Sequence, residues 1–186
     1  MAQPEFGATA WGRAWLRTIE RTQGKPHPQL PKARSLARNQ KAALTIGPEG
    51  IAASVADGSS THYVSIQIER WNADQTTSAV PILAARYTAS VVGDLPDSLA
   101  DALTKAGAPI AVTLDELTST CTCRTRSRPC AHILTALYGL VLLVDERPTA
   151  ALELRADDLP VISGTYENWI GLATLRAAGF YSSAQA

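Results

Sequence analysis

The chain has 186 residues, of which 46% are hydrophobic, and it carries 17 basic and 17 acidic side chains. This length and composition are typical of a folded domain with an ordinary core, and the zero net charge gives no overall electrostatic footprint for nucleic acid. The charge is distributed unevenly, because residues 1–41 hold eight Lys or Arg against two acidic residues, whereas residues 42–120 hold nine acidic against three basic residues. An interaction with nucleic acid would therefore depend on local basic patches.

The N-terminal part is predicted to be helical and then irregular. Residues 9–22 place Trp11 and Trp15 at helical spacing, with arginines on a second stripe, which predicts an amphipathic helix whose tryptophans seal it onto a sheet. Three prolines interrupt the next segment, so we expect a loop there, followed by a short helical turn over residues 32–40.

From residue 41 the hydrophobic period changes to two, which indicates β-strands. Three strands are expected, at residues 41–47, 50–57 and 62–70. The connections between them are short, and the first contains Pro48, Glu49 and Gly50. Because such short connections join neighbouring strands of opposite direction, the segment is predicted to form an antiparallel meander.

The remaining elements are mostly helices. One helix is expected from about Ser78 to Val92, with Pro81 confined to its first turn, and a second from Pro96 to Ala106, ended by Gly107. The rest of the chain is predicted to contain a short strand over residues 109–117, a buried helix over residues 133–144, and a docked helix after Asp157 with a frayed tail.

These elements predict an α+β fold with an N-terminal helix, a small antiparallel sheet, further helices, and a knuckle of strand, loop and helix in the C-terminal half. The expected organisation is an N-terminal α+β region at 1–118, this knuckle at 119–146 and a C-terminal extension at 147–186. The start of the chain lacks the basic and apolar segments of a signal peptide, and no stretch is long enough to span a bilayer. We therefore expect a cytoplasmic protein without a membrane partner.

All three cysteines lie in the segment CTCRTRSRPCAH, residues 121–132. An odd number of cysteines in a reducing compartment argues against a disulfide framework and favours metal ligands or redox groups. In an extended chain Cys121 and Cys123 point to the same side. Pro129 disfavours helix before Cys130, so Cys130 is expected at the helix start and His132 in its first turn.

This arrangement predicts one structural Zn²⁺ held by Cys121, Cys123, Cys130 and His132. Four protein ligands leave no vacancy for water or substrate, so no catalysis is expected at the metal. Two alternatives stay open, namely a redox pair at Cys121 and Cys123 with Cys130 incidental, or three unrelated thiols. His27 and His62 are predicted not to be ligands, since neither lies near another candidate ligand in the sequence.

The pattern Cys-x-Cys, six residues, Cys-x-His and an apolar helix resembles the SWIM zinc finger. The segments AWGRAWLRTIE and LPKARSLAR also look like the small bacterial SWIM-finger proteins that accompany SWI/SNF-type helicases, and the resemblance covers about residues 6–155. It implies the same four ligands, a role in binding DNA or protein, and no enzymatic activity. The family commonly has Pro-Asp after its second cysteine, where this chain has Arg124 and Thr125, so the chemistry of the exposed loop differs.

The first functional hypothesis is binding of DNA or another nucleic acid, because arginines held between zinc ligands are suited to grip phosphate oxygens. The candidate residues are Arg124, Arg126, Arg128, Lys32, Arg34, Arg38 and Lys41. Alternatively, these loop arginines are solvated and only neutralise the thiolates.

The second hypothesis is a protein-protein adaptor that docks onto a helicase or a recombination factor. The chain has four tryptophans, at 11, 15, 71 and 169, and aromatic side chains often anchor interfaces. An enzyme is not expected, because the adjacent Asp157 and Asp158 have no evident catalytic partner, and neither a small-molecule substrate nor a phosphate-binding glycine loop is indicated.

Overall fold

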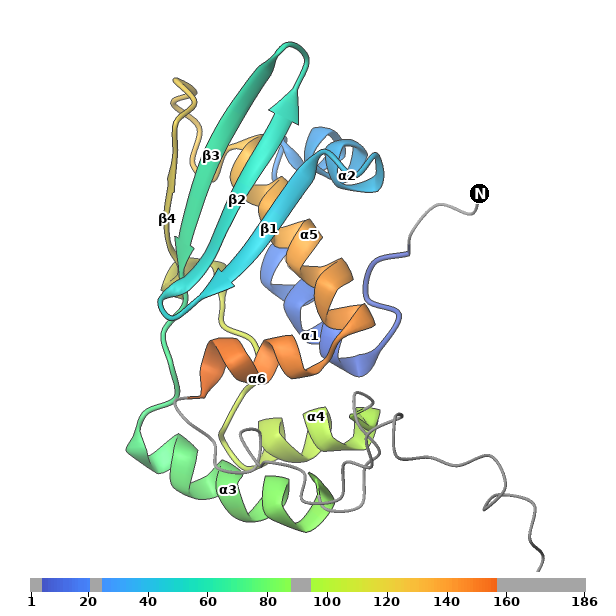
Figure 1. Cartoon of the computed structure of the whole chain (residues 1–186), viewed down its shortest axis with the longest axis vertical. Helices are drawn as coiled ribbons and strands as arrows, with labels where there is room; N and C mark the ends of the chain where they lie inside the picture. Colours follow the sequence, from blue (N-terminus) through green and yellow to red (C-terminus); the bar gives the residue numbers. More distant parts are fainter. Residues whose placement is uncertain (1–4, 21–24, 88–94, 157–186) are drawn as a thin grey trace, which may run out of the picture.

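The computed structural model describes residues 5–20, 25–87 and 95–156. Within these ranges the fold is α+β, as predicted, and it consists of helices and a four-stranded antiparallel sheet (Figure 1). The elements in chain order are α1 (Ala10–Ile19), α2 (Leu30–Arg38), β1 (Ala42–Gly47), β2 (Gly50–Asp57), β3 (Ser60–Gln67), α3 (Ala73–Tyr87), α4 (Asp97–Lys105), the 3₁₀ helix η1 (Leu114–Glu116), β4 (Thr118–Cys121), α5 (Ala131–Glu146) and α6 (Thr149–Arg155).

The sheet has the order β1-β2-β3-β4, so the predicted meander is confirmed and a fourth strand extends it. In the pairing of β3 with β4, Val64 lies opposite Cys121 and Gln67 lies opposite Thr118. Buried and exposed positions alternate along β3, as expected for a sheet that is covered on one side only. This pairing places the first cysteine on the edge strand of the sheet, opposite Val64 of β3.

Helix α5 is the centre of the core. It is buried on nearly every side, as its apolar sequence predicts, and it contacts the sheet, α1 and α2 (Figure 1). Trp11 and Trp15 of α1 are 0% and 1% exposed. Their helix packs against α5 and α4, which corrects the prediction that the tryptophans seal α1 onto the sheet. The sequence indicated the buried stripe of α1 but not its partner, because any apolar surface can cover it.

The start of α1 is fastened to the end of α5 by one carboxylate. Asp145 accepts hydrogen bonds from the backbone amides of Gly7 and Thr9, both at 2.8 Å, and from the Thr9 hydroxyl at 2.9 Å. The same hydroxyl accepts a bond from the Gly12 amide and so caps α1. Gly12 faces the carboxylate so closely that a Cβ atom would overlap it. The absent side chain at this position is what allows the two helices to meet.

Helix α3 corrects the prediction for Pro81. The helix begins at Ala73, earlier than predicted, and Pro81 lies in its interior instead of its first turn. The early start has a local cause, since the Asn72 side chain accepts from the Gln75 amide and the Gln75 side chain accepts from the Asn72 amide. Pro81 is exposed, so its ring causes no conflict in the core, although it removes one helical hydrogen bond.

The segment before the cysteines also differs from the prediction. Only Thr118–Cys121 forms a strand, and η1 occupies part of the region predicted as extended. The Glu116 carboxylate accepts hydrogen bonds from the Thr113 amide at 2.6 Å and from the Thr113 hydroxyl at 2.8 Å. Together with the backbone bond from the Glu116 amide to the Thr113 carbonyl at 3.1 Å, these bonds hold the chain in the turn of η1, so the strand begins only at Thr118.

The shorter helices complete the fold. Helix α2 confirms the predicted helical turn, and α4 confirms the second predicted helix, with Gly107 after it at a φ of 82°. Helix α6 was not predicted, and the helix expected after Asp157 lies outside the described residues. Among the described segments, each helix is too short or too polar to cross a membrane.

Candidate metal centre

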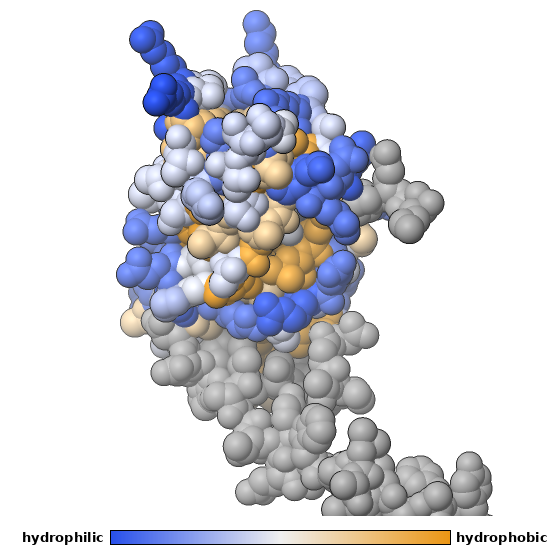
Figure 2. Space-filling model, turned by 45° about the horizontal axis from the view of Figure 1, so that its top comes forward, coloured by the Kyte–Doolittle hydropathy of each residue, from blue (hydrophilic) through white to orange (hydrophobic). Residues whose placement is uncertain are grey.

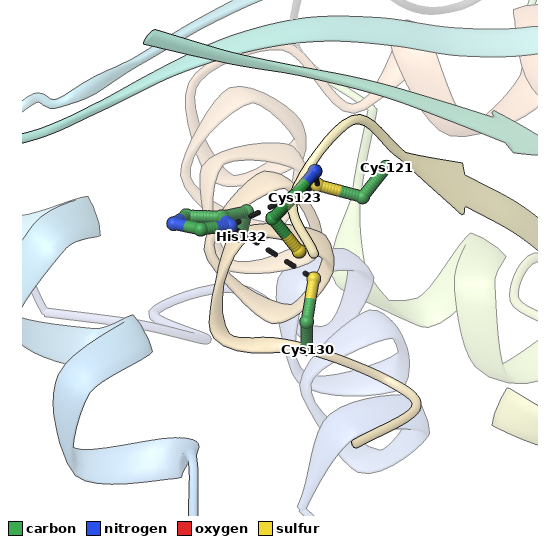
Figure 3. A group of neighbouring side chains, drawn as sticks. All are labelled: Cys121, Cys123, Cys130 and His132. Atoms are coloured by element: carbon green, nitrogen blue, oxygen red, sulfur yellow. Dashed lines mark hydrogen bonds between the residues drawn. The ribbon is translucent and has the colours of Figure 1, made fainter. Parts of the chain in front are cut away.

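Four side chains converge where β4 approaches the start of α5. Cys121 is the last residue of β4, Cys123 follows it in the turn, Cys130 is the N-cap of α5 and His132 lies in its first turn. The positions predicted for Cys130 and His132 relative to the helix are confirmed. Figure 3 shows the three sulfurs and the imidazole directed toward a common centre, and their ligand atoms all lie within 4.8 Å of one another.

The spacing fits a tetrahedral zinc ion. The Nδ1 atom of His132 lies 3.7 Å from the Cys121 sulfur and 4.0 Å from the Cys130 sulfur. Around zinc, with bonds of about 2.3 Å to sulfur and about 2.0 Å to nitrogen, the same atoms would be roughly 3.5 Å apart. Shifts of a few tenths of an ångström to about one ångström would therefore bring all four atoms into ligand positions. The donor set of three sulfurs and one imidazole is one that structural zinc sites use.

The cluster favours negative charge at one of its thiols. Burial raises the pKa of Cys121 to about 12. Burial also acts to raise the pKa of Cys123, but hydrogen bonds involving His132 and the Thr125 amide outweigh it, and the pKa falls to about 5. The Arg128 guanidinium lies 3.8 Å from the Cys123 sulfur, which raises the pKa of Arg128. One loop arginine thus faces the thiol cluster, as the electrostatic argument from the sequence expected.

The opposite edge of the His132 ring contacts the hairpin between β2 and β3. Its Nε2 atom lies 3.0 Å from a carboxylate oxygen of Asp57, and Lys32 from α2 lies 2.6 Å from the same oxygen. These two partners, Lys32 first, lower the pKa of Asp57. The His62 ring stacks on the His132 ring with centroids 4.0 Å apart. Asp57, His62 and His132 form a second group of close titratable side chains.

Sequence reasoning did not find Asp57 and treated His62 as isolated. Both residues are about 70 or more positions away from His132 in the chain, and only the packing of the hairpin against α5 brings them together. His27 lies in the loop before α2, where its Nδ1 atom accepts a hydrogen bond from the Gln29 amide. For His62, the only signal in the sequence was the alternation of apolar and polar residues along β3, which places its side chain on the covered side of the sheet.

Comparison with known families agrees with this geometry. Residues 106–138 match the model of the SWIM zinc finger. The chain carries a SWIM zinc finger. The match includes all four converging residues, and it identifies a zinc-binding domain in this part of the chain. No curated protein and no solved structure matches the chain.

The loop of the SWIM finger presents its arginines to solvent. Arg124, Arg126 and Arg128 are all exposed in the turn between β4 and α5. Arg128 also faces the Cys123 sulfur, whereas Arg124 and Arg126 have no ion-pair partner within the part of the chain that the structure describes. The two arginines are therefore free to meet an anion.

The basic residues in and after α2 contact other side chains more often than the loop arginines do. Lys32 pairs with Asp57 at 2.6 Å, and Arg34 pairs with Glu20 at 2.6 Å. The Arg38 guanidinium lies over the Phe6 ring, 5.7 Å from its centroid. Lys41, between α2 and β1, is exposed. Because Lys32 and Arg34 already have carboxylate partners, a phosphate would have to compete for them.

Proposed function

We propose that the chain binds one zinc ion through Cys121, Cys123, Cys130 and His132, and that the ion is structural. The convergence of these four ligand atoms on one centre carries the proposal. Four protein ligands complete a tetrahedron, so the bound ion would supply a cross-link between β4 and α5 and no open coordination position. The proposal therefore includes no catalytic role for the SWIM finger.

We further propose that the finger binds nucleic acid through the phosphate backbone. The support is the arginine loop, which begins and ends at proposed zinc ligands, Cys123 and Cys130, and exposes Arg124 and Arg126. Fixing a loop at both ends lowers the ordering cost of each contact that it makes. Arginine forks pair with phosphate oxygens through two parallel hydrogen bonds. Contacts of this kind position a protein on nucleic acid without reading its sequence.

The test is the salt dependence of DNA affinity for the zinc-loaded protein. Replacing Arg124 and Arg126 together by Gln removes two candidate phosphate contacts. The slope of log affinity against log salt, which is negative, should therefore become flatter by about 1.8 on duplex DNA. The control replaces Lys105 and Arg147 by Gln, which removes the same formal charge at the ends of α4 and α5, away from the loop (Figure 1), and also breaks the ion pair of Arg147 with Glu153 at 2.8 Å. This control should keep the original slope.

Two results would refute nucleic-acid binding through the loop. One is undetectable affinity for duplex and single-stranded DNA at low salt. The other is an equal decrease of slope in the loop variant and the control variant, which would mean that only net charge matters. Zinc content is measured separately by native mass spectrometry, so the loss of one proposal does not affect the other.

The alternative function is a protein-protein adaptor, and a different surface supports it. Tyr63 is 65% exposed on the face of the sheet that points away from α5. The outward-facing strand residues around it are uncharged, namely Ala43, Thr45, Ala52, Ser54, Ser65, Gln67, Thr118 and Thr120. An uncharged face with an exposed aromatic ring is typical of protein contact surfaces.

The tryptophans do not support the adaptor function in the way the sequence suggested. Trp11, Trp15 and Trp71 are 0%, 1% and 5% exposed and belong to the core, and Trp169 lies outside the described residues.

Figure 2 shows hydrophilic side chains projecting from the end of the molecule that carries the hairpin and the arginine loop. A stoichiometric protein partner whose binding is lost in Tyr63→Ser but kept in the arginine variant would favour the adaptor function.

A further inference from the structure

We propose that Asp57 is the positioning residue of the zinc site, holding the His132 ring so that its Nδ1 atom faces the three thiolates. The inference rests on the zinc ligation proposed above. It assigns to the tip of the β2–β3 hairpin a direct role in metal affinity. Asp57 lies outside residues 106–138, the segment that matches the SWIM finger.

The two nitrogen atoms of His132 have different surroundings. Nδ1 lies 3.7 and 4.0 Å from two sulfurs, whereas Nε2 lies 3.0 Å from the Asp57 carboxylate. A metal-bound imidazole nitrogen carries no proton, so the other nitrogen must carry it and act as the donor. With zinc on Nδ1, the Nε2–H group donates to Asp57. A carboxylate in this position fixes the tautomer and the ring orientation of a ligating histidine.

The surroundings of Asp57 suit this role. Lys32 lies 2.6 Å from the oxygen that faces His132, so the carboxylate is held from α2 as well as from its own strand. The His62 ring stacks on His132 with an interplanar angle of 26°, which limits rotation of the ligand ring. The His132 side chain is only 7% exposed, so water has little access to replace the carboxylate. Three elements, α2, β2 and β3, therefore converge on the outer edge of one proposed ligand.

The same atoms allow one competing interpretation, which is a second metal site. Asp57, His62 and His132 have ligand atoms close enough to share an ion. Such an ion would replace the hydrogen bond between the Nε2 atom of His132 and Asp57, and it would bind a carboxylate that already pairs with Lys32. Two cations would then compete for one carboxylate, and His132 would have to bridge two metals. The positioning role requires neither of these, so we favour it.

The test measures zinc affinity by competition with a chromogenic chelator on the full chain, with zinc stoichiometry from native mass spectrometry. Asp57→Asn should weaken zinc binding about 10- to 100-fold, the usual effect of removing a partner of this kind. Asp101→Asn, on the exposed face of α4, is the matched control and should change affinity less than about twofold. Lys32→Gln should have a smaller effect than Asp57→Asn, because it leaves the carboxylate on His132.

A purely structural role of Asp57 would give a different pattern. If Asp57 supported zinc binding only through its ion pair with Lys32, then Lys32→Gln and Asp57→Asn would weaken zinc binding equally. That result would overturn the proposal. Two zinc ions in the unmodified chain and one in Asp57→Asn would overturn it in favour of the second metal site. Equal affinities of Asp57→Asn and the Asp101 control would overturn it as well.

A second measurement needs no variant and covers the case in which Asp57→Asn does not fold. Nuclear magnetic resonance of the zinc-loaded, unmodified chain reports which nitrogen of His132 carries the proton. The expected result is a proton on Nε2 and zinc on Nδ1, and the reverse assignment would overturn the proposal. If the unmodified chain binds no zinc, the zinc proposal itself fails, which distinguishes that outcome from failure of the positioning role alone.

Discussion

Replacing one sulfur ligand should weaken the metal site without rearranging the rest of the fold. Cys130 is the best position for this change, since it is 1% exposed, occupies the N-cap position of α5 and has its sulfur 4.0 Å from the Nδ1 atom of His132. Cys130→Ser exchanges a thiolate for a hydroxyl of similar shape, which zinc binds much less well at neutral pH. The proposed cross-link between β4 and α5 would then lose one of its two attachments to the helix.

The size of the effect follows from the number of ligands. Structural zinc sites in small fingers bind with about 10–16 kcal/mol, so each of four ligands contributes on average about 2.5–4 kcal/mol. This loss corresponds to zinc affinity weaker by roughly two to three orders of magnitude. With zinc in excess, the free energy of unfolding falls by the same amount. The melting temperature should then be lower by about 5–15 °C for a chain of this size.

The assay combines zinc affinity from chelator competition with melting curves in the presence and absence of zinc. The matched control is Ala131→Ser, which adds a hydroxyl in the same buried turn but leaves the four ligands intact. It should cost about 1 kcal/mol through its buried hydroxyl and keep the zinc affinity unchanged. If Cys130→Ser bound zinc as tightly as this control, or if chelation left the melting temperature of the unmodified chain unchanged, the tetrahedral site would be wrong.

Two further changes test the packing around α5. Gly12→Ala would push a methyl group into the Asp145 carboxylate and disrupt its bonds to Gly7 and Thr9, so the free energy of unfolding measured in urea should fall by about 2–4 kcal/mol. The control is Gly47→Ala, whose added methyl group meets no atom within 4 Å and should change the free energy of unfolding by less than about 1 kcal/mol. Equal losses in the two variants would contradict this explanation of Gly12. Leu137→Ala, at a fully buried position of α5, should lower the free energy of unfolding by about 2–5 kcal/mol, and a loss below about 1 kcal/mol would show that the helix is not the centre of the core.

The chemistry of the candidate site could be predicted from the sequence because its ligands are close together in the chain. Cys121, Cys123, Cys130 and His132 span twelve residues, and Pro129 fixes where the helix starts. Local geometry is then enough to bring the side chains to one side, and the match of residues 106–138 to the SWIM finger agrees with it. The meander and the buried helix α5 were predictable for the same reason, since a hydrophobic period is a local property.

Elements whose boundaries depend on a cap were predicted less well. The start of α3 is decided by reciprocal bonds between Asn72 and Gln75, and the late start of β4 by the two bonds that Thr113 donates to the Glu116 carboxylate. These pairs are visible in the sequence but compete with other local signals, such as Pro81.

The surroundings of the metal ligands were decided only by the tertiary structure. Asp57 and His62 reach His132 because the β2–β3 hairpin packs over the start of α5, and α2 delivers Lys32 to the same carboxylate. Likewise, α1 packs mainly against α5 and α4. Hydrophobic burial fixes which residues must be covered but not by what, because it has no direction; contacts between distant segments therefore depend on how the whole chain packs.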